Sequence, residues 1–285
     1  MLELEHIEID DLELFSELFT KGFIQRGAVL TLADDTANFF LLTCGSQSAL
    51  VAAKGVFLNL VREGKCGVIT PRDKEQVCAA WGFKNYDLVV LLGNAGSGKT
   101  TLAIAFAWQR IFKANKKLIL CKPTVQVGSS KAIGTVPGTV EEKLAPYITS
   151  YLSTMKDIAG KANFADKIEE LKEKDMLEFL PIELVRGRNL AGGVTLIVDE
   201  AQNLSVHELN SVLSRAGEDA QVILLGDLSQ IDTKMRMEET GLYSLISSET
   251  FLDSEISIGI KLVQCYRGGV AKLSIDWMEE LAAKR

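Results

Sequence analysis

Histidine is nearly absent from this chain of 285 residues, which contains only His6 and His207. Two histidines so far apart argue against a histidine-based metal site or a catalytic triad. The five cysteines are scattered and include no Cys-x-x-Cys pair, which argues against a zinc ribbon or a disulfide scaffold. We therefore expect reduced, mostly buried thiols in a cytoplasmic protein.

Excess positive charge and long apolar runs are also missing. The formal net charge is -7, so any nucleic-acid binding must come from a local basic patch. The first 20 residues carry seven acids and no Lys or Arg, the opposite of a signal peptide. Apolar runs such as residues 88–92 are far shorter than the roughly 20 residues of a membrane helix. With 47% hydrophobic residues, the composition predicts a globular protein with no membrane partner.

The sequence divides into two parts near Thr70-Pro71, because proline disfavours helix at the preceding residue. Residues 1–70 predict a small α+β region, and residues 71–285 predict the main domain. In the first part we expect strands at residues 29–32 and 39–43. A helix is expected at residues 47–62, with Gly64 near its C-terminal cap.

The second part alternates apolar runs of strand length with segments of helical periodicity. Helices are expected at residues 100–113, 205–216 and 270–283. The expected strands are residues 87–92, 117–121, 194–198, 221–225 and 256–263. Continuous apolar strands that alternate with helices predict a mainly parallel sheet covered on both faces. The fold class is therefore α/β.

A phosphate-binding loop is the strongest local signal. The segment Gly93-Asn94-Ala95-Gly96-Ser97-Gly98-Lys99-Thr100 follows a strand and opens a helix, the context that a P-loop requires. Its main-chain N–H groups would surround the phosphates of ATP, and Thr101 completes the predicted nucleotide-binding set. Lys99 is expected to reach the β- and γ-phosphates, and the Thr100 hydroxyl to bind Mg²⁺.

Two further strand ends carry the residues expected to act on that nucleotide. Asp199 directly follows the strand at residues 194–198 and suits the magnesium site. Glu200 suits a general base for the attacking water. Gln202 and Gln230 are candidates for contact with the γ-phosphate, since an amide both donates and accepts. This pattern favours a hydrolase; a small-molecule kinase, the less favoured alternative, would need an acceptor site that we do not recognise.

With these motifs in place, the chain resembles the first motor domain of superfamily 1 helicases and, more closely, the PhoH family of P-loop ATPases. Further segments that carry the resemblance are residues 122–128, 133–147, 186–190 and 214–217. The resemblance covers roughly residues 70–270 and implies a three-layer P-loop NTPase (RecA-like) core with ATPase activity. It also implies a link to RNA metabolism. Tyr266-Arg267-Gly268-Gly269 stands where relatives often have an Arg-His segment. We recognise neither the fused ribonuclease of some relatives nor a Gly-x-x-Gly RNA clamp.

The 53 residues after Asp232 are too few for the second motor domain of a monomeric helicase. We therefore expect subunits that assemble head to tail, so that a neighbour's arginine completes each site. Head-to-tail contacts that close on themselves form a ring. The resemblance favours a hexamer. The candidates are Arg186, Arg188, Arg215, Arg236 and Arg267. Arg267 is also a candidate for action within its own subunit.

RNA or single-stranded DNA is a possible partner because one stretch is locally basic. Residues 110–131 contain six Lys or Arg and no acid, although without interleaved aromatics they equally fit a solvated helix end and loop. Gln76, upstream of the P-loop, is a candidate for reading adenine, with an exposed helix position as the alternative. An alternative to the ATPase is a nucleotide-gated assembly protein with slow hydrolysis and no unwinding.

Overall fold

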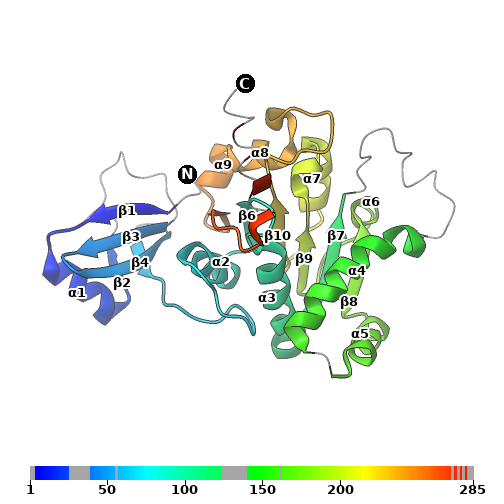
Figure 1. Cartoon of the computed structure of the whole chain (residues 1–285), viewed down its shortest axis with the longest axis horizontal. Coiled ribbons are helices and arrows are strands. Elements are labelled where there is room, and N and C mark those ends of the chain that lie inside the picture. Colours follow the sequence, from blue (N-terminus) through cyan, green and yellow to red (C-terminus); the bar gives the residue numbers. More distant parts are fainter. Residues whose placement is uncertain are drawn as a thin grey trace.

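The computed structural model describes residues 4–25, 39–54, 57–123, 140–160 and 162–270, together with residues 273, 274, 277 and 280. The strand expected at residues 29–32 lies outside this set. Two sheets organise the described chain, one built from its first 60 residues and one from residues 88–262 (Figure 1). Across the described residues, no helix is both long and apolar enough to span a lipid bilayer.

The first sheet has five strands in the order β1-β3-β4-β5-β2, with β1 parallel to β3 and the other neighbours antiparallel. Helix α1 covers one face of this sheet, where its Phe15 and Leu18 are fully buried. The elements are β1 (Glu5–Glu8), α1 (Leu12–Lys21), β2 (Phe23–Gln25), β3 (Phe39–Cys44), β4 (Gln47–Lys54) and β5 (Phe57–Leu60).

The helix expected at residues 47–62 is wrong, because this segment forms the antiparallel strands β4 and β5. Alternate residues of β4 face two different cores: Leu50 and Ala52 face α2 (Lys74–Asn85), while Ala49 and Val51 join the core under α1. Because both faces are apolar, the two-residue alternation of a half-buried strand is absent from the sequence. Gly64 accordingly caps no helix.

The second sheet has six strands in the order β11-β6-β10-β9-β7-β8, and every neighbouring pair is parallel. This arrangement confirms the α/β fold class and all five strands expected after residue 86. The strands are β6 (Leu88–Gly93), β7 (Lys117–Lys122), β8 (Leu177–Pro181), β9 (Val194–Val198), β10 (Gln221–Gly226) and β11 (Ser257–Leu262).

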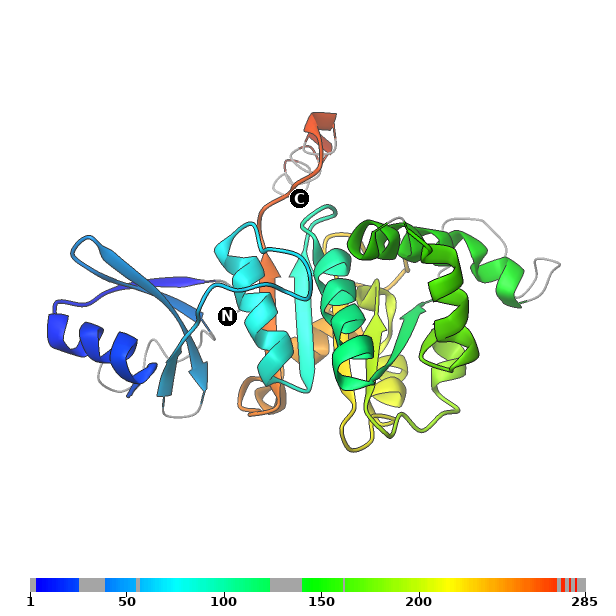
Figure 2. The ribbon, with the colours of Figure 1, turned by 90° about the horizontal axis from the view of Figure 1, so that it is seen from below.

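Helices cover both faces of this sheet (Figure 2). On one face lie α2, α3 (Lys99–Ala114), α4 (Val140–Ala159) and α5 (Phe164–Glu173). On the other lie α6 (Ile182–Val185), α7 (Val206–Leu213), α8 (Gly241–Ile246) and α9 (Glu249–Leu252). The described residues between 269 and 280 are helical, as expected, and stand away from the body of the sheet (Figure 2).

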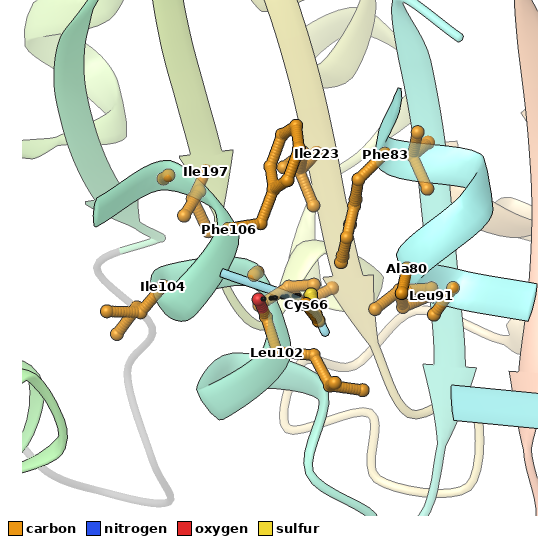
Figure 3. Close-up of a cluster of buried hydrophobic side chains, with 14 of the residues drawn as sticks. Cys66, Ala80, Phe83, Leu91, Leu102, Ile104, Phe106, Ile197 and Ile223 are labelled. Atoms are coloured by element: carbon orange, nitrogen blue, oxygen red, sulfur yellow. Dashed lines mark hydrogen bonds between the residues drawn. The ribbon is translucent and has the colours of Figure 1, made fainter. Parts of the chain in front are cut away.

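A continuous core joins the two sheets through α2. Phe83 of α2 stacks on Phe106 of α3, with the ring centroids 5.0 Å apart (Figure 3). Beside them the Cys66 thiol donates to the main-chain oxygen of Leu102 at 3.5 Å, and burial raises the pKa of Cys66 to about 12. Four of the five cysteines are buried and all five are free thiols, as expected.

Candidate active site

A cleft of about 670 Å³ opens at the carboxyl ends of the strands of the second sheet. The phosphate loop lies at the end of β6, Lys122 at the end of β7, Asp199 at the end of β9 and Asp227 at the end of β10. Parallel strands deliver these segments to one edge, where open α/β sheets bind ligands. From the predicted site, the cleft is lined by Gln76, Ala95, Gly96, Gly98, Lys99, Thr100, Thr101, Asp199, Glu200, Gln230 and Arg267.

The phosphate loop curls tightly between β6 and α3. Gly96 and Gly98 have φ angles of +85° and +94°, the left-handed region that glycine adopts without strain. The Lys99 ammonium donates to the main-chain oxygens of Gly93 and of Asn94, the latter at 3.1 Å. Burial lowers the pKa of Lys99, against the opposing charges of Asp227 and Asp199. The loop therefore holds the Lys99 ammonium against its own main-chain oxygens, at the wall of the cleft.

Asp199 and Glu200 lie side by side on the opposite wall. The main-chain N–H of Glu200 donates to Asp199 Oδ1 at 3.1 Å, and burial followed by the charge of Glu200 raises the pKa of Asp199. Glu200 has a φ of +55°, a left-handed conformation that is uncommon outside glycine. Its carboxylate faces Lys122 Nζ at 3.5 Å and accepts from Gln202 Nε2 at 2.7 Å.

Gln202 is fully buried and lies behind the cleft instead of on its wall. Its amide N–H groups reach Glu200 and the main-chain oxygen of Gln230, while its side-chain oxygen accepts the Asp227 N–H. Gln230 lines the cleft and turns its own amide to Asp227 Oδ2 at 2.6 Å. The Gln202 amide therefore ties the ends of β9 and β10 together, while the Gln230 amide braces the segment after β10. Direct contact of Gln202 with a nucleotide stays a prediction.

Gln76 and Arg267 line the cleft beside the phosphate loop. Gln76 is only 5% exposed, which rules out the exposed helix position; its amide donates to Ser97 O at 3.0 Å. The Arg267 side chain lies over Gly96, where an added Cβ would come within 2.5 Å of its Cγ. The next residue back, Tyr266, donates its main-chain N–H to the oxygen of Gly96 at 2.9 Å.

Several residues that line or adjoin the cleft were not among the predicted site residues, and they include Arg72, Lys122, Tyr151 and Tyr266. Arg72 and Tyr266 form a pair, with the guanidinium 5.0 Å from the ring centroid. Tyr151 of α4 donates its hydroxyl to Asp199 Oδ2 at 3.2 Å. The position of Lys122, directly after an expected strand, was a usable sequence signal, whereas a tyrosine in mid-helix gives no signal of this contact.

The candidate arginines fall in different places. Only Arg267 lines the cleft of its own chain. Arg186 pairs with Glu208 at 3.0 Å and Arg188 with Glu178 at 2.7 Å. The exposed Arg236 pairs with Glu239 at 2.9 Å, and Arg215 is exposed on the turn after α7. None of these positions tests a role in a neighbouring subunit.

The basic residues between 110 and 131 do not form one surface among the described residues. Arg110 donates to Gln221 Oε1, and Lys117 pairs with Asp175 and Glu178 at 2.6 and 3.0 Å. Lys117 and Lys122 lie at opposite ends of β7, about 17 Å apart by the rise of a strand. Lys131 lies outside the described residues. Of the described basic residues in this stretch, Lys122 is the one that lines the cleft.

The oxygen donors at the cleft fit a magnesium ion that is shared with a nucleotide. Thr100 and Asp199 both line it, and magnesium is held by one or two carboxylates together with substrate phosphates. Within the described part of the chain, no three His, Cys, Asp or Glu side chains gather into a metal site. The donor set therefore suits a nucleotide-dependent ion and not a protein cage.

The family model of the PhoH-like protein matches residues 68–279. The chain belongs to the PhoH family. Protein PhoH2 of Bacillus subtilis (strain 168) is 34% identical over 278 residues, which cover 93% of this chain and 61% of that protein. A PhoH-like protein of the same organism is 37% identical over 166 residues, covering 58% and 49%. The chain thus spans between about half and two thirds of the length of these PhoH relatives.

Solved structures match the chain only at low similarity. The large terminase from a thermophilic bacteriophage aligns with 73% of this chain and 50% of its own, with 13% identity and a TM-score of 0.44. Membership of the PhoH family, together with the phosphate loop and the parallel sheet, supports a nucleotide-binding domain of the P-loop kind.

Proposed function

We propose that this PhoH-family chain is a magnesium-dependent ATPase motor domain. The observation that carries the proposal is the meeting of Lys99, Thr100, Asp199 and Glu200 in one cleft, from segments about 100 residues apart in sequence. A phosphate-binding lysine, two oxygen donors and an adjacent carboxylate are the parts that NTP hydrolysis needs.

Each of these side chains has a proposed role. The N–H groups of residues 93–101 bind the phosphates, and Lys99 neutralises charge that develops on the γ-phosphate. Glu200 orients the attacking water and accepts its proton, and Gln230 contacts the γ-phosphate. Thr100 and Asp199 hold the magnesium ion, which supplies charge stabilisation at the phosphate oxygens when bound.

The part of the cleft beyond the phosphate loop has a proposed role in binding the nucleobase. Gln76, Arg72 and Tyr266 line the cleft beyond the loop, where the nucleobase would lie if the phosphates occupy the loop. Gln76 keeps one amide N–H and one lone pair beyond those bound to Ser97 and Arg72, enough to read an adenine edge. This arrangement supports ATP as the nucleotide.

The finer part of the proposal is a ring, with a hexamer favoured, that works on RNA or single-stranded DNA. Its support is the family match over residues 68–279 and the position of Lys122 at the cleft edge. A neighbour's arginine would raise the rate by about 10³–10⁵-fold, so assembly and turnover should rise together.

A second candidate is a nucleotide-gated assembly protein with slow hydrolysis. The observation that favours it is that Glu200 is engaged on both carboxylate oxygens, by Lys122 at 3.5 Å and by Gln202 at 2.7 Å. If these contacts persist with nucleotide bound, they would compete with the attacking water for the Glu200 carboxylate. Hydrolysis would then be slow, and binding alone would carry the function.

The test is free-phosphate release from Mg·ATP, with and without single-stranded RNA or DNA, on protein sized by light scattering. The variants Lys99→Ala and Glu200→Gln accompany the natural chain, and Glu63→Gln on the exposed segment after β5 is the matched control. Turnover that both site variants abolish, that nucleic acid raises, and that appears only in the oligomer supports the motor. Tight nucleotide binding with negligible release throughout supports the assembly protein instead.

A further inference from the structure

Tyr151 lies at the middle of α4, with its ring buried and its hydroxyl at the candidate active site. The side chain is 5% exposed, and its ring stacks on Phe179 of β8 with the centroids 6.3 Å apart and the planes 14° from parallel. The hydroxyl donates to Asp199 Oδ2 at 3.2 Å. Ser150 and Thr154, its neighbours on α4, line the cleft itself.

This hydrogen bond completes the orientation of Asp199. Oδ1 accepts the main-chain N–H of Glu200 at 3.1 Å and Oδ2 accepts the Tyr151 hydroxyl, so each oxygen has one fixed donor. A carboxylate oxygen has two lone-pair positions, which leaves one on each oxygen for a cation or its bound water. The plane of the carboxylate is therefore set from two sides.

The donor is also of the right charge for such a site. Tyr151 is a neutral donor, which orients a carboxylate without cancelling its negative charge. A lysine in this place would compete with a divalent cation for that charge. The nearby Lys122 pairs with Glu200 at 3.5 Å, and its charge also acts on Asp199. Packing alone does not explain the hydroxyl, because phenylalanine would fill the same space without a buried polar group that needs a partner.

We propose that Tyr151 is a positioning residue that aims Asp199 at the magnesium ion. This inference rests on the proposed function, since it presumes that Asp199 belongs to the magnesium site. Groups that orient metal-binding side chains change metal affinity or activity by about 10–100-fold when they are removed. Removing the Tyr151 hydroxyl should therefore raise the magnesium concentration that nucleotide binding requires. It should not weaken nucleotide binding in the absence of magnesium.

The first experiment measures binding of a fluorescent ADP analogue to the full chain, in EDTA and across a magnesium titration. For Tyr151→Phe we expect the affinity in EDTA to stay within about twofold of the natural chain. The magnesium concentration for half-maximal tightening should rise about 10-fold or more. Tyr86→Phe is the matched control: its hydroxyl is likewise buried, bonds to Ala53 O at 3.4 Å, and lies away from the cleft.

The second experiment is a double-mutant cycle with Asp199→Asn. If Tyr151 acts through Asp199, Tyr151→Phe should add no further change in the magnesium requirement on that background. In ATP hydrolysis, the apparent KM for magnesium should rise more than kcat falls. Far-ultraviolet circular dichroism and urea unfolding establish that every variant is folded.

The outcomes distinguish failure of the positioning role of Tyr151 from failure of the proposed function. A result in which magnesium tightens ADP binding by the natural chain and by Tyr151→Phe at the same magnesium concentration would overturn the positioning role and leave the magnesium site standing. An equal loss of affinity in EDTA and in magnesium would also overturn it, since that is a packing effect. If the natural chain shows no magnesium dependence, the proposed function fails and this inference falls with it.

Discussion

Gln202 donates its side-chain amide to the main-chain oxygen of Gln230 across 2.9 Å, and its side-chain oxygen accepts the N–H of Asp227 at 3.1 Å. One buried amide thus holds the end of β10 against the end of β9. Asn203 adds a second tie, because its side chain exchanges two hydrogen bonds with Asp232. The acidic segment and the Gly-Asp-Leu-Ser-Gln segment are therefore one structural unit, and a displacement of either is transmitted to the other.

Replacing Gln202 should damage both stability and turnover. In Gln202→Ala the buried Asp227 N–H and Gln230 oxygen lose their partner, which should lower the free energy of unfolding by about 1–3 kcal/mol. Misplacement of Glu200 and Gln230 should lower kcat by about 10-fold to 100-fold, with nucleotide affinity nearly unchanged. Urea unfolding and steady-state kinetics measure the two effects. Gln109→Ala on α3 is the control, and a normal kcat in Gln202→Ala would refute the coupling.

Gly67 should be intolerant of any side chain, unlike Gly64 three residues earlier. Gly67 has a φ of +63°, and an added Cβ would lie 2.0 Å from the main-chain oxygen of Ala105 in α3. Nothing lies within 4 Å of a Cβ at Gly64, where φ is ordinary. We expect Gly67→Ala to lower the free energy of unfolding by about 2 kcal/mol or more, and Gly64→Ala to leave it nearly unchanged. Equal unfolding midpoints for the two variants would contradict this packing.

Glu208 gives the fold a defined pH dependence at the start of α7. Burial alone would raise its pKa, but hydrogen bonds from the Ser205 N–H and hydroxyl and the charge of Arg186 outweigh burial and hold the pKa below its ordinary value. A depressed carboxyl pKa stabilises the fold at neutral pH, and this contribution is lost as pH falls through the folded-state pKa, below about 4.3.

Glu208→Gln should therefore lower stability at pH 7 by about 0.5–1 kcal/mol, after allowance for solvent screening. The difference from the natural chain should shrink toward pH 3, where both side chains are neutral. Urea unfolding at a series of pH values measures it, with the exposed Glu218→Gln as control. A difference that stays constant with pH would show that the capping box acts without the charge.

Arg267 should act on the cleft of its own subunit. Its side chain lies over Gly96 and lines the cleft, so Arg267→Ala should lower turnover while the fold is retained. Mixing Arg267→Ala with Lys99→Ala subunits distinguishes the two possible geometries. If Arg267 serves its own site, every site in a mixed assembly lacks one group and no turnover returns. Recovered turnover in the mixture would identify Arg267 as the arginine supplied across an interface.

The main sheet and the loop that binds phosphate could be predicted because their sequence signals are local. The P-loop spacing, the acidic pair after β9 and the five apolar strands all lie where the sequence indicates. The segment at residues 47–62 could not be predicted in the same way. Its alternate residues enter two separate cores, so both faces are apolar and the alanines suggest a helix.

Contacts between distant segments were the part of the site that the sequence did not reveal. Tyr151 reaches Asp199 across 48 residues, and Tyr266 reaches Asp73 across 193. Neither pair has a spacing that marks it, because the crossover helices and the order of the strands bring them together. The buried position of Gln202 has the same origin, since it follows from the pairing of β9 with β10.

Helix α2 has a consequence for any attempt to shorten this protein. Its Gln76 donates a hydrogen bond to Ser97 O of the phosphate loop. Its Trp81 packs edge-on against Phe39 of the first sheet, with the ring centroids 5.8 Å apart. The boundary at residue 71 therefore passes through a shared core. A chain trimmed to begin there would expose Val77, Trp81 and Tyr86 to water, the kind of apolar surface that drives aggregation. A minimal stable fragment should accordingly include the amino-terminal sheet.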